Sequence, residues 1–506
     1  MNDSAETRHT RPRRTGVLLT MVISLVIAAA CGGSATPAAT AAATGTTTAA
    51  ASTASASTTG NTTGTTASGT ALAGGAPGGA PAGGPGGAPG GAPGGGSSST
   101  ALASTATGAY LQGGGTTAKT GETYTATRAD ESGVLATSGA TLTLTKATVI
   151  TSGNTSSSDN SSFAGLNAGV LATGGSTIRM TGGTISTTGT GANGGFASGI
   201  GSSLTLNDVT ITATADGGHG VMATQAGTVT VTGGSMTTSG AHGAPLATDR
   251  GGGTVTATGG TYIANGTDSP GIYSTGSITV SGATFTEKTS ENIVIEGANS
   301  ATAADTRMTS GSDKSGVMIY QSMSGDATGS QGTVTLSGGS LATTSTSAPA
   351  FYVTNSTGVI SLTNVTVTEA SGILIRAAAG SWGTSGSNGG RARLTAGGEA
   401  LTGDVVADSI SSVDLSLATG STLTGAINAD KAAKSTGLTL DVTSSWTVTA
   451  DSHLATLTGA VVSGTSITNI TGHGHTVTYD ATASANAYLH GATYALVGGG
   501  TLAPVA

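Results

Sequence analysis

The stretch GVLATSGATLTLTKATVI, residues 133–150, carries the pattern that decides the fold. Within it, Leu142 and Leu144 alternate with threonines. Successive side chains of a β-strand point to opposite faces, so the leucines are expected to face a core and the threonines to face solvent. Ser-Gly and Gly-Gly pairs separate the short apolar segments, which is typical of tight turns. The stretch therefore predicts short strands joined at glycine corners.

The same pattern returns many times along the chain, with most starts roughly 22–27 residues apart. The starts lie at Gly133, Gly169, Gly195, Gly220, Ala244, Gly271, Asn292, Gly316, Ala350 and Gly372. A repeat of this length is typical of β-solenoids, and no segment after the N-terminal region shows a helical period. The sequence therefore predicts an all-β fold. We expect a right-handed parallel β-helix with three short strands per coil, in which stacked coils bury a continuous apolar column.

The copies differ in length. Extra residues occur at about 154–166, 321–332 and 380–391. Insertions in a solenoid leave it as loops, often on the binding face. After about residue 400 the copies become longer and less regular, and we expect wider coils that end in a cap, because an open last coil exposes unpaired strand edges.

The N-terminal region contains Cys31, the only cysteine of the chain. Four arginines precede an apolar run over residues 17–30, and small residues lead directly to the cysteine. This arrangement is that of a secretory signal and resembles a bacterial lipoprotein signal, although Ala28 stands where that family usually has leucine. The resemblance implies that Cys31 becomes the first mature residue and carries a lipid. The alternatives are an ordinary signal peptide, or a transmembrane anchor, for which the run falls short of about 20 residues.

The segment after the cysteine has an unusual composition. Between Gly32 and Ala118 there is no charged residue, and Ala, Thr, Ser, Gly and Pro dominate. Such a segment has too little bulky apolar surface to offset the entropy of ordering, so it is expected to be a disordered stalk. The predicted organisation is a signal peptide (1–30), a lipidated cysteine with a disordered linker (31–115), a parallel β-helix (116–400) and irregular coils with a cap (401–506). We expect the protein to be extracytoplasmic, anchored to the membrane by lipid and displayed at the cell surface.

Charge and cysteine usage exclude several kinds of partner. The chain carries a net charge of −8 and only 8% charged residues. This surface does not attract nucleic acid phosphate and lacks basic clusters for anionic lipid. One cysteine forms no disulfide within the chain and no thiolate metal site. His473 and His475 are too few ligands for a closed metal site, so we expect neither a metal nor another cofactor.

A run near the C-terminus adds a family resemblance. Together with the coil pattern, SWTVTADSHLATL (445–457) resembles the passenger domain of pertactin-type and related adhesin autotransporters. The segments 249–253, 320–326, 382–390 and 403–410 are similar to those of a group of bacterial surface β-helix proteins. The resemblance implies the fold and surface display, and it names no ligand.

Two other functions are known for repeats of this kind. Pectate lyases and polygalacturonases are also parallel β-helices, but they need clustered or paired acids, and here the acids are spread, as with Glu291, Glu296, Asp404 and Asp408. Gly218-His219-Gly220 matches a short polygalacturonase motif without its acidic partners. The Thr-x-Thr strands resemble the threonine ladders of ice-binding solenoids, but Asn, Arg and Ala interrupt them, and threonine is a common outward residue of strands.

The sequence thus favours an adhesin-like or glycan-binding surface protein without catalytic activity. Its partners are expected to be the membrane, through the lipid, and glycans or host or neighbouring cell surfaces. The candidate ligand contacts are Tyr320, Asp326, Trp382 and Arg391, on the inserts and the strands next to them. A polysaccharide-degrading enzyme and a purely structural envelope protein stay open as alternatives. Acids that converge across adjacent coils would favour the enzyme.

Overall fold

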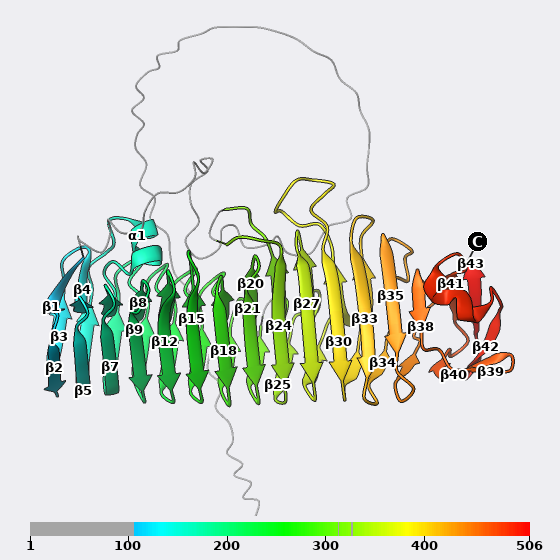
Figure 1. Ribbon diagram of the computed structural model, residues 1–506, viewed down its shortest axis with the longest axis horizontal. Helices are drawn as coiled ribbons and strands as arrows, with labels where there is room; N and C mark the ends of the chain where they lie inside the picture. The colour runs from blue at the N-terminus through cyan, green and yellow to red at the C-terminus, as the bar shows by residue number, and fades with distance from the viewer. Residues whose placement is uncertain (1–105, 312, 325–326, 506) are drawn as a thin grey trace, which may run out of the picture. The chain divides into compact units, whose positions relative to one another are not determined.

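The computed structural model describes residues 106–505 except 312 and 325–326. The predicted signal peptide, Cys31 and most of the predicted linker lie outside these residues. The described residues form a parallel β-solenoid, in which strands from successive coils lie side by side (Figure 1). Its first strand begins at Thr107, earlier than the predicted boundary at 116.

One strand of each coil up to β32 contributes to a 12-stranded sheet, called sheet A here. All its neighbouring pairs are parallel and join one coil to the next, as Val221 pairs with Leu246 and Leu246 with Ile272. Its strands are, in order, β1 (Thr107–Gly113), β4 (Glu131–Thr137), β6 (Val170–Thr173), β8 (Gly195–Ser198), β11 (Val221–Thr224), β14 (Leu246–Thr248), β17 (Ile272–Ser274), β20 (Ile293–Glu296), β23 (Val317–Tyr320), β26 (Phe351–Thr354), β29 (Ile373–Ala377) and β32 (Asp404–Ala407).

The other strands of most coils form a 22-stranded sheet, called sheet B. Most coils give it two strands, so the predicted three strands per coil are confirmed there. Its strands are β2 (Thr116–Thr120), β3 (Thr123–Ala126), β5 (Thr141–Thr151), β7 (Thr177–Thr187), β9 (Ser203–Asn207), β10 (Thr210–Ala213), β12 (Gly227–Thr232), β13 (Ser235–Thr238), β15 (Gly253–Thr258), β16 (Thr261–Ala264), β18 (Ser277–Ser281), β19 (Thr284–Glu287), β21 (Ser300–Ala304), β22 (Arg307–Ser310), β24 (Gln331–Ser337), β25 (Ser340–Thr343), β27 (Thr357–Thr363), β28 (Thr366–Glu369), β30 (Arg391–Gly397), β33 (Ser412–Ala418), β35 (Ser435–Leu440) and β38 (Thr456–Thr458).

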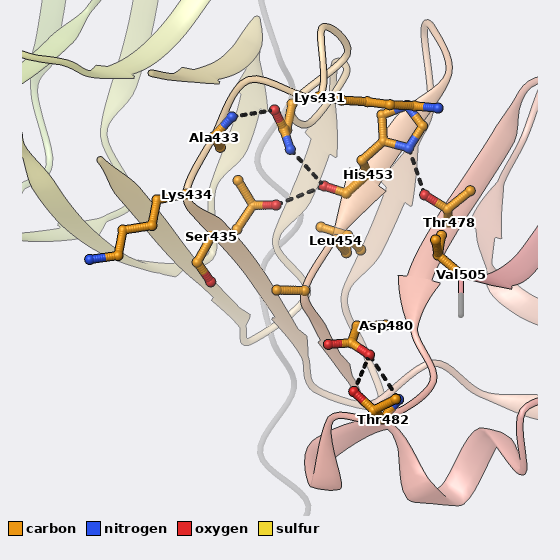
Figure 2. A pocket seen from close by; sticks show the side chains of 13 residues that line it. Lys431, Ala433, Lys434, Ser435, His453, Leu454, Thr478, Asp480, Thr482 and Val505 are labelled. Atoms are coloured by element: carbon orange, nitrogen blue, oxygen red, sulfur yellow. Dashed lines mark hydrogen bonds between the residues drawn. The ribbon is translucent and has the colours of Figure 1, made fainter. Parts of the chain in front are cut away.

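The last coils build a nine-stranded sheet, called sheet C, and a cap. Its strands are β31 (Ala400–Thr402), β34 (Thr422–Thr424), β36 (Ser445–Thr447), β37 (Ser452–Leu454), β39 (Val462–Ser463), β40 (Ser466–Thr471), β41 (Thr476–Asp480), β42 (Tyr494–Val497) and β43 (Thr501–Val505). In the parallel pair of β37 and β41, the His453 ring faces Thr478, with 2.6 Å between Nδ1 and Oγ1 (Figure 2). A 3₁₀ helix (Ser484–Leu489) and the antiparallel pair of β42 and β43 end the solenoid, as the irregular C-terminal repeats predict.

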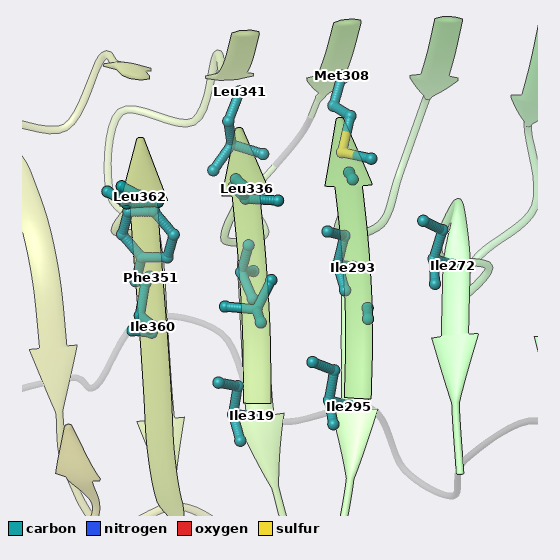
Figure 3. Packing of buried hydrophobic residues seen from close by; sticks show 14 of the residues in the cluster. Ile272, Ile293, Ile295, Met308, Ile319, Leu336, Leu341, Phe351, Ile360 and Leu362 are labelled. Carbon is teal, nitrogen blue, oxygen red and sulfur yellow. The ribbon is translucent and has the colours of Figure 1, made fainter. Parts of the chain in front are cut away.

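The inside of the coils contains the predicted apolar column. In β12, Val229 and Val231 are buried, whereas the threonines between and beside them are at least partly exposed. The pattern repeats in register on β15. Figure 3 shows the interior of the middle coils, where Ile293, Ile319 and Phe351 pack between the sheets. Each such side chain contributes about 1.5–3 kcal/mol through burial, so the stack of coils is the main source of stability.

The outward side of sheet A departs from the alternating pattern. Its strands are buried on both faces over much of the sheet, as in β6, β11 and β20. The outward residues form a second apolar cluster that includes Phe196, Met222, Tyr273, Val294, Met318 and Tyr320. Sheet A is therefore covered on its outer side, and the inserts supply part of that cover.

Helices are few among residues 106–505. The α-helix α1 spans Ser158–Ala164 within the first insert. Within this part of the chain no helix has the length and apolar character needed to cross a bilayer.

Candidate functional site

The three predicted inserts all connect to strands of sheet A. The first leads from β5 through α1 into β6, the second follows β23, and the third follows β29. Figure 1 shows α1 and the two later loops on the same side of the solenoid. The site is therefore built on the outer face of sheet A, which is called the insert face here.

The first insert is held on this face by its helix. Ser157 caps α1 by accepting a hydrogen bond from the Asn160 N–H at 3.2 Å, and Gly165 ends it with a φ of 78°. At Gly165 a Cβ atom would lie 2.7 Å from Leu171 and Phe196, so glycine allows the close approach to β6 and β8.

The carbonyl of Phe163 fastens the helix to the next coils. It accepts hydrogen bonds from Thr224 Oγ1 at 2.8 Å and from Gln225 Nε2 at 2.9 Å. The Phe163 ring lies under the Arg250 guanidinium, with 3.9 Å between the Cζ atom and the ring centroid. This cation–π contact brings the first insert to the end of β14.

A buried carboxylate lies at the centre of the outer face. Glu296, the last residue of β20, is fully buried. Its Oε2 atom accepts hydrogen bonds from the hydroxyls of Tyr273 at 2.7 Å and Tyr320 at 2.9 Å, and its Oε1 atom accepts one from Ser322. Burial and the neighbouring Glu296 charge hold the pKa of Tyr273 well above its usual value, so this phenol stays a donor.

The second insert closes over this carboxylate. Ser324 Oγ lies 3.4 Å from Glu296 Oε1. Gln321 Nε2 donates to the carbonyl of Gly329 at 2.6 Å, and Asn355 Nδ2 donates to the carbonyl of Gln321 at 2.6 Å. Because a carboxylate without partners is costly to bury, Glu296 and its hydroxyl donors fix the path of the loop.

The third insert adds an aromatic surface to the second. The Trp382 ring packs on Tyr320, with 5.6 Å between the ring centroids. Asn388 Nδ2 donates to the carbonyls of Gly380 and Trp382 at 2.9 and 2.8 Å, which closes the loop. Trp382 itself is half-buried, and its Nε1 atom is buried without a hydrogen-bond partner among the described residues.

The structure describes three of the four predicted contact residues, Tyr320, Trp382 and Arg391. Trp382 and Tyr320 lie together, and Tyr320 is fully buried beneath the inserts. Its hydroxyl is directed to Glu296 and its ring supports Trp382. Arg391 is exposed, yet it begins β30 of sheet B rather than standing on the insert face. Asp326 and Cys31 lie outside the described residues.

The sequence analysis treats Glu296 as one of several spread acids and does not predict that it is buried on one face with Asp249. Ala247, Tyr273 and Val294 are in register on three successive coils. Asp249 and Glu296 each follow two residues later, so their Cα atoms are about 10 Å apart. Both side chains are buried. The available signal was Glu296 at the end of the apolar run Ile293-Val-Ile, where an outward carboxylate next to a buried strand needs partners.

His219 has a structural place in the turn before β11. It is fully buried, and its Nδ1 atom accepts a hydrogen bond from the Ala244 N–H at 2.9 Å. The backbone N–H of His219 donates a hydrogen bond to Asn193 Oδ1 of the preceding coil at 3.0 Å. Burial lowers the pKa of His219 to about 3, so the ring is neutral. The Gly-His-Gly motif therefore forms part of a buried polar ladder between coils.

Comparison with known proteins gives no relative to set beside this geometry. No family model, no curated protein and no solved structure matches the chain. Among the described residues there is also no group of three or more His, Cys, Asp or Glu side chains placed to hold a metal ion. The chemistry of the site must be argued from its own residues.

Proposed function

We propose that this β-solenoid is a lipid-anchored cell-surface protein that binds glycans as an adhesin, without catalysis. The observation that carries the proposal is the insert face. The third insert places Trp382 on Tyr320 of β23, and a buried network centred on Glu296 holds Tyr320 and the second insert beside it.

A half-buried tryptophan on a fixed loop suits a sugar ligand. An aromatic ring gives a large apolar contact area together with one polar group, the indole N–H. In Trp382 the Nε1 atom is buried without a partner among the described residues, so the part offered to a sugar is the exposed portion of the ring. The support under the ring matters because a rigid contact loses little entropy on binding.

Adhesion is favoured over hydrolysis by the burial of the acids. Asp249 and Glu296 lie on the same outer face two coils apart, so they are the acids to weigh as a catalytic pair. However, the Glu296 oxygens already accept hydrogen bonds from two tyrosines and Ser322. A general acid must reach the glycosidic oxygen of its substrate, and the second insert covers this carboxylate.

Lipid anchoring rests on the N-terminal sequence. Cys31 follows a signal-like apolar run, and the uncharged segment behind it is composed like a flexible stalk. Together they would hold the solenoid away from the membrane surface. Growth in labelled palmitate, followed by detection of label on the wild-type chain but not on Cys31→Ala, tests this part separately.

The binding proposal is tested with the full chain on immobilised polysaccharides and whole cells. Retained protein and newly released reducing or unsaturated sugar ends are both recorded. We expect retention without released ends, and a loss of at least tenfold in affinity for Trp382→Ala. Val442→Ala is the matched control, because Val442 is an exposed apolar residue of the C-terminal coils. Released ends would contradict the proposal, and absence of both retention and release would favour a structural role.

A further inference from the structure

A cavity of about 420 Å³ lies in the C-terminal coils, and none of its lining residues belongs to an insert. Its walls come from the loop 428–434 and from β35, β37 and β41 (Figure 2). The volume lies within the range of small-molecule sites, about 300–1,000 Å³. The cavity is therefore large enough for a sugar ring.

One side of the cavity is apolar and the other is held rigid by hydrogen bonds. Leu454, Ala455 and Val505 supply apolar lining. Asn428 accepts a hydrogen bond from the Ala433 N–H at 3.0 Å and donates to the His453 carbonyl at 3.5 Å. The same carbonyl accepts from Thr436 Oγ1 at 2.7 Å. The wall is thus formed before a ligand binds.

Three charged side chains at the cavity have groups that can bind a ligand. Lys431 and Lys434 are exposed and form no ion pair there. Figure 2 shows Lys431 beside the His453 ring and Lys434 on the other side of the cavity. Asp480 uses its Oδ1 atom for the Thr482 N–H and hydroxyl, which leaves its Oδ2 atom for a ligand.

The geometry points to a binding site for an acidic oligosaccharide, with carboxylates of different sugar units at Lys431 and at Lys434, on the two sides of the cavity, and a ring hydroxyl on Asp480. The inference rests on the proposed function in that the ligand is a glycan. The Asp480 carboxylate accepts hydrogen bonds from sugar hydroxyls but repels a phosphate dianion. The apolar lining at Leu454 and Ala455 suits the C–H face of a sugar ring.

The state of His453 agrees with this assignment. Burial, and then the nearby Lys431 charge, lower the pKa of His453. The imidazole is therefore neutral near pH 7, and Nδ1 is engaged with Thr478. The positive charge at the cavity resides on the two lysines, so they are the residues to change.

The test measures calorimetric binding of tri-galacturonate to the full chain. Its methyl ester, which has the same ring without the charge, and inorganic phosphate are the comparison probes. We expect micromolar to millimolar binding of the acid and at least tenfold weaker binding of the ester. Lys431→Ala and Lys434→Ala should each weaken binding about tenfold, as expected for a lost charge-assisted hydrogen bond. Lys288→Ala, an exposed lysine on a distant coil, should change nothing.

The outcomes separate this inference from the proposed function. Binding that depends on the lysines but not on Trp382 supports the acidic site even if the insert face binds no glycan. Equal binding of acid and ester, tighter binding of phosphate, or an unchanged affinity in both lysine variants overturns it. If the acidic site is overturned, retention on neutral polysaccharide that depends on Trp382 still supports the proposed function.

Discussion

The outer faces of sheets A and B follow the same strand rule and end in opposite environments. On β12 and β15 of sheet B, the outward residues are threonines in register, such as Thr230 and Thr256, and they are at least partly exposed. On β17 and β20 of sheet A, the outward residues Tyr273 and Val294 are also in register, yet both are buried. The coils are the same, so the difference comes from what lies over each face.

The comparison shows how a repeat protein separates stability from function. The threonine face needs only β-favouring polar residues that remain in contact with water. The insert face combines aromatic residues, a buried carboxylate and loops that leave the repeat. Features that break the repeat are concentrated there, and repeats with such insertions often bind ligands on that side. The following predictions are ordered by expected size.

The largest effect is expected at the centre of the insert face. Glu296→Ala leaves the hydroxyls of Tyr273 and Tyr320 buried without their acceptor and opens a cavity. Each buried hydroxyl left without an acceptor costs about 1–3 kcal/mol, so the loss for two hydroxyls is about 2–6 kcal/mol. Urea denaturation should show this loss in the free energy of unfolding, with Glu296→Gln less affected. A loss below about 1 kcal/mol would mean that the second insert is not anchored by this carboxylate.

The free energy of unfolding is expected to depend on pH through His219, in the turn before β11. His219 has a folded pKa of about 3 and an unfolded value near 6.5, so the unfolded state binds the proton more readily. The contribution of the neutral, buried His219 to the free energy of unfolding is complete above pH 6.5. Between pH 6.5 and 3 it falls by up to about 1.4 kcal/mol per pH unit. His219→Asn should remove this slope when the two free energies of unfolding are subtracted. If the free energies of unfolding of the wild type and of His219→Asn changed with pH in parallel, the ring would not be buried in its neutral form.

A smaller change at the same network tests one hydrogen bond. Tyr273→Phe keeps the buried ring and removes the hydroxyl that donates to Glu296. We expect a loss of about 1–2 kcal/mol, since other donors remain on the carboxylate. Tyr262→Phe is the control, because its hydroxyl donates only to the Gly259 carbonyl, at 3.2 Å. Equal losses of stability in Tyr273→Phe and Tyr262→Phe would show that the hydrogen bond to Glu296 stabilises the fold no more than an ordinary hydrogen bond to a backbone carbonyl.

The smallest effect is expected on the threonine face. Thr230→Ser keeps an outward hydroxyl on β12, and its stability should stay within about 0.5 kcal/mol of wild type, as for most surface substitutions. Retention on polysaccharide should also be unchanged. A loss of binding in this variant would place the ligand surface on sheet B and remove the functional distinction between the faces.

The sequence predicts the solenoid because the alternation of Leu142 and Leu144 with threonines is local and repeats. It also predicts the three inserts and the Trp382 region, since extra residues interrupt a regular spacing. It does not predict that Tyr320 is buried, because burial of an outward position depends on loops from its own coil and from a later one that fold over it. Glu296 and Asp249 are brought to one side by inter-coil register, which becomes visible only when the coils are stacked.

Hydrogen–deuterium exchange of the full chain, with and without a polysaccharide that retains it, tests the central claim most directly. The account predicts that bound glycan slows amide exchange in 378–390 around Trp382 and in the described residues of 321–330, while β12, β15 and β18 exchange as before. Slowed exchange confined to those sheet B strands, with the inserts unchanged, would contradict it.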